Sequence, residues 1–265
     1  MVGSALNSTL VGGSAACFAS IAAGTAELAA RIAATDPPGS DPALPASLKP
    51  CGGQVGGAGA GSATALADLM TYEATIFGNF QGVVQYNEES AGEDVVRCVP
   101  RLPLPPLPTQ PLKTLGMHVS DLCAIMAPGG AQPATAQASL DALGNATALF
   151  TYTASGCVPS SFSQDFVKAY HLDDVTAWNE SNRQWTYQSC NEFGYFQTTA
   201  PTSGDPATNL APSGPLSNPF SSFAAINATT AGAFVCEASF NLTEGRCPAN
   251  SPFVTKRIFF PLFGG

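Results

Sequence analysis

Eight cysteines are spread along the 265-residue chain, and none of them forms a C-x-x-C pair: Cys17, Cys51, Cys98, Cys123, Cys157, Cys190, Cys236 and Cys247. A structural zinc site needs closely spaced ligand pairs, and the chain adds only two histidines, His118 and His171. An even number of cysteines without such pairs is typical of a disulfide framework. We therefore predict a disulfide-linked fold with no metal site and no cofactor.

Five N-x-Ser/Thr sequons favour an oxidising compartment as well, because they are glycosylation acceptors in secreted proteins: Asn7, Asn145, Asn179, Asn227 and Asn241. The N-terminal MVGSALNSTLVGGSAAC has neither the basic start nor the firm apolar core of a signal peptide. No apolar run is long enough to cross a bilayer. We expect a glycoprotein of the secretory pathway, lysosomal, vacuolar or extracellular, whose true N-terminus precedes this sequence.

Charge is scarce and acidic on balance. Charged residues make up 11% of the chain, against 45% apolar residues, and the net charge is −9. The ten lysines and arginines are scattered, whereas nucleic-acid binding needs clustered cations that displace phosphate counterions. An anionic membrane surface is excluded on the same ground. We therefore expect neither nucleic acid nor a membrane as a partner.

Apolar residues at helical spacing predict two long helices, over 14–34 and 62–87, with Ser14 and Ser62 as N-caps. The second has one apolar stripe: Leu66, Leu69, Met70, Ile76, Phe77, Phe80 and Val84. Further helices are expected at 113–127, 134–153 and 161–193, the second weakened by Gly144. Proline and glycine predict loops at 36–61 and, with serine and threonine, at 200–232. Convincing alternating strands are missing, so we predict a mainly α-helical bundle.

The segment RLPLPPLPTQPL (101–112) cannot form a regular helix or a central strand, because repeated proline removes backbone donors and fixes φ. Two interpretations stay open: an extended connector within a secreted fold, or a ligand for proline-binding modules. The C-terminal RIFFPLFGG is an apolar, core-type run that ends abruptly.

Two segments carry a resemblance to a known family. RQWTYQSCNEFGYFQTT (183–199) closely resembles the signature of the prolyl carboxypeptidase and dipeptidyl peptidase II family of serine peptidases. FGNFQGVVQYNEE (77–89) resembles an upstream segment of that family that ends in V-Q-Y-N. The resemblance is good over about 14–98 and 113–200, and poor after residue 200.

The resemblance implies a disulfide-linked helical cap inserted in an α/β-hydrolase fold. On this basis the chain is an internal fragment. Residues 1–199 would be the cap, with a Pro-rich connector at 99–113, and 200–265 an irregular remnant of, or return to, the hydrolase domain. The order of cysteines in the family suggests three disulfides and leaves Cys98 and Cys247 over: Cys17–Cys123, Cys51–Cys157 and Cys190–Cys236.

The activity that the resemblance implies is proline-selective exopeptidase action, of carboxypeptidase or dipeptidyl-peptidase type, on peptides with a penultimate proline. The full-length enzyme that the resemblance implies is also compatible with a homodimer. The hydrolase order is Ser, Asp, His, which would place the nucleophile before residue 1 and the other two after residue 200. We assign no catalytic residue and expect the chain as given to be inactive. A secreted helical binding protein without catalysis and a dead paralogue are the alternatives.

Two residues imitate parts of a triad. Ser14, in Gly12-Gly13-Ser14 with Ala16 behind it, resembles half of a nucleophile elbow, but no strand precedes it and it fits better as a helix N-cap. His171 lies in the wrong order, before the signature, and is better explained as a partly exposed helix residue.

Within the signature, aromatic and polar side chains predict a substrate wall rather than a reaction centre, because proline rings pack on aromatic faces. The candidates are Trp185, Tyr187, Glu192, Phe193, Tyr195 and Gln197. Tyr195 holds a position that in relatives lies near the pocket for the penultimate proline. For Trp185 and Phe193 core packing is the alternative. Glu192 could bind a peptide's N-terminal amine, pair with Arg183 or cap a helix.

Overall fold

The structure, a computed structural model, describes residues 2–56, 63–85, 87, 117–150, 156–170, 181–193, 196, 198–199 and 218–240. This part is mainly helical, and its only β-type pairing is an isolated bridge between Pro50 and Val158. Its α-helices are α1 (Val2–Asn7), α2 (Ala15–Ala34), α3 (Ala63–Gln85), α4 (Val119–Met126), α5 (Ala136–Ala148), α6 (Ser181–Gln188) and α7 (Val235–Phe240).

Short 3-10 and π-helical turns join these helices. The 3-10 turns are η1 (Thr9–Val11), η2 (Ala46–Leu48), η6 (Pro128–Gly130) and η8 (Val167–Tyr170). The π-helical segments are η7 (Phe162–Phe166), η10 (Ser189–Phe193) and η12 (Ala228–Phe234).

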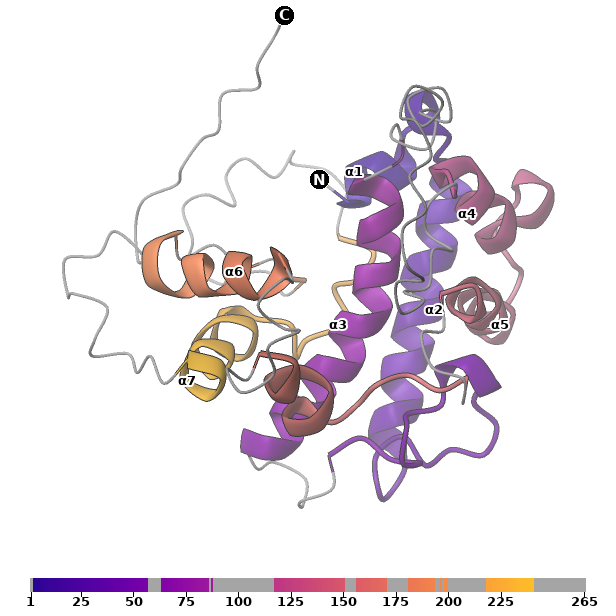
Figure 1. The fold of residues 1–265 in the computed structure, drawn as a ribbon. Coiled ribbons are helices and arrows are strands. Elements are labelled where there is room, and N and C mark those ends of the chain that lie inside the picture. Colours follow the sequence, from indigo (N-terminus) through magenta and orange to yellow (C-terminus); the bar gives the residue numbers. More distant parts are fainter. Residues whose placement is uncertain are drawn as a thin grey trace, which may run out of the picture.

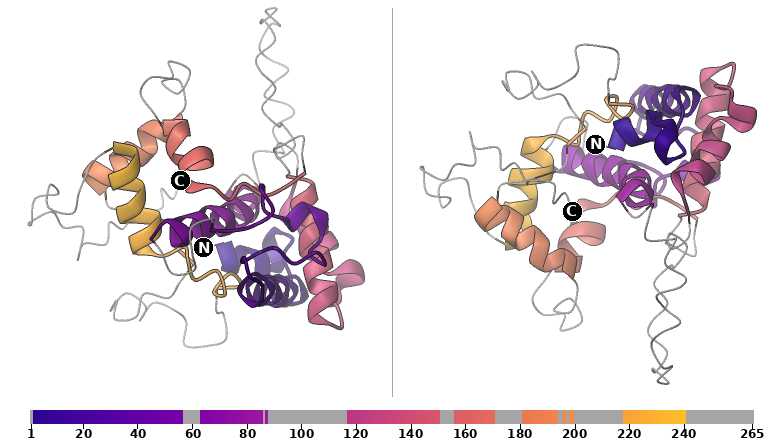
Figure 2. Two further views of the ribbon diagram at one scale, coloured as in Figure 1. Left: turned by 90° about the horizontal axis from the view of Figure 1, so that it is seen from below. Right: turned by 90° about the horizontal axis from the view of Figure 1, so that it is seen from above.

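The two long helices, α2 and α3, form the centre of the molecule. Figures 1 and 2 show α4 and α5 on one side of this pair and α6 and α7 on the other. The predicted helices 14–34 and 62–87 are confirmed as α2 and α3, to within a few residues at their ends. Ser14 caps α2, since its hydroxyl accepts the N–H of Cys17 at 3.1 Å. Ser62 lies outside the described residues.

One apolar core joins α1 to α5 with the segment 218–226. Phe220 is fully buried and meets Phe77 and Phe80 edge to face, with ring centroids 5.1 and 5.3 Å away. On the other side of this segment, the buried hydroxyl of Thr25 donates to the carbonyl oxygen of Pro219 at 2.8 Å. Residues 218–226 thus link α2 to α3.

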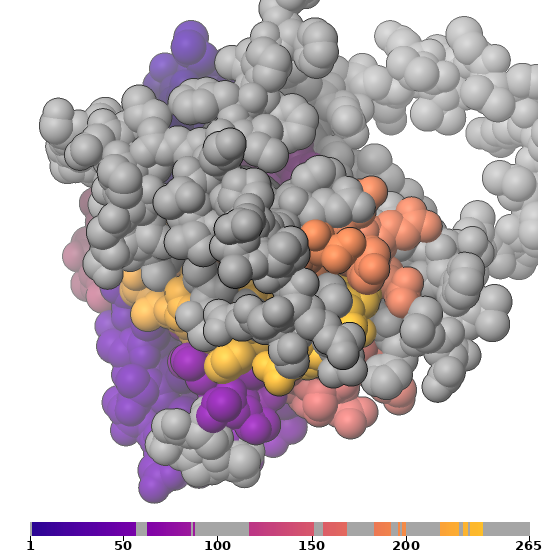
Figure 3. Space-filling model, turned by 90° about the vertical axis from the view of Figure 1, so that its left-hand side faces the viewer, coloured from indigo at the N-terminus to yellow at the C-terminus, as the bar shows by residue number. Residues whose placement is uncertain are grey.

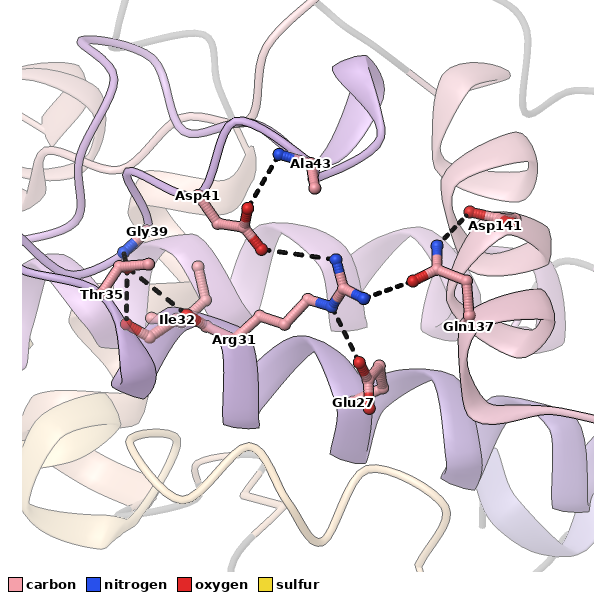
Figure 4. Close-up of polar contacts among 9 residues, drawn as sticks. All are labelled: Glu27, Arg31, Ile32, Thr35, Gly39, Asp41, Ala43, Gln137 and Asp141. Atoms are coloured by element: carbon pink, nitrogen blue, oxygen red, sulfur yellow. Dashed lines mark hydrogen bonds and ion pairs between the residues drawn. The ribbon is translucent and has the colours of Figure 1, made fainter.

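Polar contacts fix the loop after α2. Arg31 forms an ion pair with Glu27 at 2.8 Å and reaches Asp41 at 3.4 Å and the side chain of Gln137 on α5 (Figure 4). The hydrogen bond that Arg31 donates to Glu27 is the main cause that raises the pKa of Arg31 above its ordinary value. One guanidinium therefore holds α2, the 36–44 loop and α5 together.

Three disulfides link distant parts of the described chain, and they are the pairs that the resemblance implies. Cys17–Cys123 joins α2 to α4, Cys51–Cys157 joins two loops, and Cys190–Cys236 joins η10 to α7. Cys98 and Cys247 lie outside the described residues. Disulfides of this kind are typical of proteins folded in the secretory pathway.

Of the described helices, α2 alone has the length and apolar composition to cross a membrane. Its buried face packs in the core, however, and Cys17 is bonded to Cys123. The apolar composition of α2 is therefore explained by its position at the centre of the bundle.

Several predicted elements differ from the structure. Residues 161–193 were expected to form one helix, but they contain η7, η8, α6 and η10, and 171–180 lie outside the described residues. The carboxylate of Asp165 accepts the N–H groups of Ser160 and Ser161 at 3.0 and 2.9 Å, which caps a separate turn here. The predicted helix 113–127 begins only at Val119, because His118 and Asp121 form a capping box.

The segment expected to be irregular after residue 200 is helical over 228–240. Asn227 begins this helix: its side-chain oxygen accepts the N–H of Thr230 at 3.2 Å, and the Thr230 hydroxyl accepts the N–H of Asn227 at 3.1 Å. These reciprocal bonds satisfy two N–H groups at the helix start.

Candidate functional site

An apolar pocket of about 170 Å³ lies between α3, η7 and η12. Helix α3 supplies residues spaced along one face, and the other elements close the pocket around them. Its lining is Met70, Ala74, Phe77, Gln81, Phe166, Phe196, Ile226, Ala231 and Val235. Among the described residues of this lining only Gln81 has a polar side chain, so the described walls suit an apolar group.

Phe196 brings the signature segment into this pocket. On one side of it, Cys190 is bonded to Cys236 of α7. On the other side, Thr199 is buried, its N–H donates to the carbonyl oxygen of Ile226 at 3.0 Å, and its own carbonyl accepts from the Asn218 side chain at 3.1 Å. The position of Phe196 is thus set by a covalent bond and by backbone hydrogen bonds.

Gly232 lets η12 approach Phe196 closely. A Cβ at this position would lie 3.1 Å from the Phe196 ring, closer than ordinary van der Waals contact. The absence of a side chain at Gly232 therefore contributes to the shape of the pocket wall.

Of the other candidate residues predicted from the sequence, two lie outside the pocket lining and four have side chains outside the described residues. Trp185 and Tyr187 on α6 are 53% and 42% exposed and are not part of the pocket lining. Core packing, the alternative for Trp185, is therefore wrong. The side chains of Glu192 and Phe193, and all of Tyr195 and Gln197, lie outside the described residues, so their predicted roles stay predictions.

Tyr187 and Arg183 both contact Phe240 of α7. The Tyr187 ring meets it edge to face at 5.3 Å, and the Arg183 guanidinium lies 5.6 Å above it. Figure 3 shows α6 and α7 next to each other on the face that they share with part of α3. The aromatic side chains of α6 thus join α6 to α7, beside the pocket rather than inside it.

Sequence reasoning missed Glu73, a carboxyl group buried next to the pocket. Glu73 is 5% exposed, and its Oε2 accepts the N–H of Ala225 at 2.9 Å. Burial raises its pKa from the ordinary 4.5 to about 8, against the opposing effect of the Ala225 and Ile226 N–H groups. The signal was present in the sequence, since Glu73 falls within the apolar stripe of 62–87, between Met70 and Phe77.

Ser14 and His118, the candidate nucleophile and the one histidine within the described residues, are not arranged as a catalytic pair. The Ser14 hydroxyl is occupied in capping α2. His118 lies at the start of α4, where its Nδ1 is 2.9 Å from the carbonyl oxygen of Asn87. His171 lies outside the described residues. A nucleophile and base in hydrogen-bond contact are therefore not found among the residues that the structure describes.

Three of the five predicted glycosylation sites fall within the described chain. Asn145 is exposed on α5 and Asn7 is half-buried at the end of α1. Asn227 is also half-buried, and its side-chain nitrogen donates to the carbonyl oxygen of Ala224 at 3.2 Å. Asn179 and Asn241 lie outside the described residues, and modification of all five stays a prediction.

Comparison with known proteins identifies one family. The model of the family described as serine carboxypeptidase S28 matches residues 106–217, a range that includes the signature at 183–199. No curated protein and no solved structure matches the chain. The match agrees with the family that the signature segment resembles; the segment 77–89 lies outside the matched range.

Proposed function

We propose that this chain, which matches the serine carboxypeptidase S28 family over residues 106–217, forms the helical, substrate-covering part of a proline-selective serine exopeptidase. The family consists of serine peptidases, so peptides are the substrate class. The observation that carries the finer proposal is the position of Phe196, at which the signature segment enters an apolar pocket.

The pocket suits the side chain of a penultimate proline. Its lining includes three aromatic rings, and the flat, apolar pyrrolidine ring packs well on such faces. Its volume of about 170 Å³ is small, below the roughly 300 Å³ at which pockets for drug-sized ligands begin. A single small ring fits this description better than an extended peptide does.

The chemistry would come from a Ser, His and Asp set in an α/β-hydrolase portion of the enzyme, while the bundle binds and orients the peptide. The described side chains support this division of roles, because they supply an apolar wall, and no base lies next to a nucleophile among them. Glu192 distinguishes the two exopeptidase types in this proposal. If its carboxylate binds the N-terminal amine of the peptide, the enzyme releases dipeptides from the N-terminus and not residues from the C-terminus.

The same proposal places the protein in the lysosome, the vacuole or the extracellular space. The three disulfides support an oxidising folding compartment.

Saturation-transfer NMR on the chain with Ala-Pro amide tests the binding role. We expect saturation to reach the proline ring protons, to be lost in Phe196→Ala, and to be retained in Trp185→Ala, because Trp185 lies outside the pocket lining. Ala-Ala amide is the matched ligand control. Equal transfer to both dipeptides, or transfer that survives Phe196→Ala in a folded protein, would refute the proline pocket.

A fluorophosphonate probe tests the division of roles. The chain as given should remain unlabelled, since acyl-enzyme chemistry needs an activated serine. Heat-sensitive labelling of one serine would show that the chain holds its own nucleophile. The second candidate is a non-catalytic binding protein. It would be favoured if the chain binds proline and is not labelled, and if the native protein contains no hydrolase portion.

A further inference from the structure

Glu73 lies at the contact between α3 and the segment 218–240, and it forms no ion pair with a described Lys, Arg or His side chain. It is 5% exposed, and its described partners are backbone N–H groups, those of Ala225 and Ile226. Burying an ionised carboxylate in this way is costly, and a group so placed is more stable in its neutral form.

The elements packed against this part of α3 offer no compensating charge within the described chain. On α3, Tyr72 is the neighbouring titratable group, and its hydroxyl donates to the carbonyl oxygen of Leu48 at 2.6 Å. Residues 218–227, η12 and α1 contain no titratable side chain. Asp165 of η7 and Asp121 of α4 accept local backbone N–H groups. Asp68 of α3 accepts the N–H of Phe162.

The contact that Glu73 makes also determines one side of the pocket. Ala225 is followed directly by Ile226, which lines the pocket together with Ala231 of η12 and Val235, the first residue of α7. The opposite side consists of Met70, Ala74 and Phe77, the α3 residues that flank Glu73. A change at the Glu73–Ala225 bond therefore acts on both walls.

We propose that Glu73 is an acid-dependent latch, which in its neutral form holds the segment 218–240 against α3 and keeps the two walls of the apolar pocket together. Ionisation at higher pH places an unpaired charge in this contact. The charge is relieved when the segment moves away and water reaches the carboxylate. The latch follows from the position of Glu73 alone and stands whether or not the pocket binds proline.

The variant that tests the latch is Glu73→Gln, because glutamine keeps the shape of the side chain and cannot ionise. Glu237→Gln is the matched control, because Glu237 is exposed on α7, within the same segment. Amide hydrogen exchange is measured on the full chain at pH 5 and pH 9 and corrected for intrinsic exchange rates.

In the wild-type chain and in Glu237→Gln we expect the amides of 225–235 to exchange at least about tenfold faster at pH 9 than at pH 5. Those of α2 and α5 should change little. Glu73→Gln should abolish the difference. A pH-independent wild-type segment would overturn the proposal even if Glu73→Gln does not fold, and so would a pH effect that persists in Glu73→Gln. Loss of proline binding alone would not overturn the latch, because hydrogen exchange is measured without ligand.

Discussion

Gly24 of α2 lies so close to α5 that a Cβ at this position would be 2.7 Å from the carbonyl oxygen of Ser139. That is shorter than any ordinary contact of a side-chain carbon, and the two nearest atoms belong to the Ser139 backbone, which cannot rotate away. Two helices can approach this closely only where one of them has no side chain. The separation of α2 and α5, and with it the core around α2, depends on this glycine.

Gly24→Ala should destabilise the fold by about 1–3 kcal/mol, because the helices must move apart to admit the methyl group. The comparison is Gly82→Ala on α3, where no atom lies within 4 Å of an added Cβ. There alanine should stabilise the helix by about 0.5–1 kcal/mol. Urea unfolding of both variants measures this, and a stabilised Gly24→Ala protein would contradict the tight contact.

The long helices were predictable because periodic apolar residues and a clear cap specify them locally, as for α2 and Ser14. The breaks in 161–193 were not, since apolar spacing does not reveal that the Asp165 carboxylate caps a separate turn. Gly144 was taken to weaken its helix. In fact it makes room for Pro45, whose Cβ would lie 2.7 Å from an added Cβ. Long-range contacts of this kind are not encoded in local spacing.

The candidate site shows the same limit. Family resemblance indicated the segment that holds Phe196, but the pocket partners come from residues more than 100 positions away on α3. Asn227-x-x-Thr230 was a readable start signal for η12, of the capping-box kind. It was overlooked because the surrounding Ser, Thr, Pro and Gly residues suggested a loop.

Removing the Cys17–Cys123 disulfide by a double change to serine should cost about 2–5 kcal/mol, since it closes a separation of 106 residues. Loss of Cys190–Cys236, with a separation of 46, should instead release α6 and α7 first. Limited proteolysis would then cut near 181–193 while the α2–α5 core stays intact. Uniform digestion of the whole chain would contradict this local role.

Free-thiol counting under denaturing conditions checks the cysteine assignment as a whole. Six of the eight cysteines are bonded in the described chain, so protein secreted from a eukaryotic host should show two thiols or fewer. Six or more would exclude an oxidising compartment for this fold.

Stability should fall as pH rises, because of Glu73. Its pKa is raised in the folded chain to about 8 and returns to about 4.5 on unfolding. Below pH 4.5 both states are protonated, and between 4.5 and 8 only the unfolded state releases the proton, which favours unfolding. The loss reaches at most about 5 kcal/mol above pH 8.

Melting temperatures between pH 4.5 and 9 measure this dependence. The wild-type chain and Glu237→Gln should lose stability over the range. Glu73→Gln should have a flatter profile, with the difference from wild type largest at alkaline pH. Parallel profiles for Glu73→Gln and wild type would mean that Glu73 does not titrate between the two states.

Ser14 distinguishes a structural cap from a nucleophile. Its hydroxyl accepts the N–H of Cys17 in an extended backbone conformation, the geometry of an N-cap. Ser14→Ala should therefore lower the free energy of unfolding by about 1 kcal/mol. Ser14→Asp should retain wild-type stability, since a carboxylate accepts the same bond and interacts favourably with the helix N-terminus. A nucleophile would behave differently: wild-type Ser14 would react with a fluorophosphonate, and both variants would lose that label whatever their stability. Restored stability in Ser14→Asp, with no labelling of the wild type at Ser14, is the result that we expect.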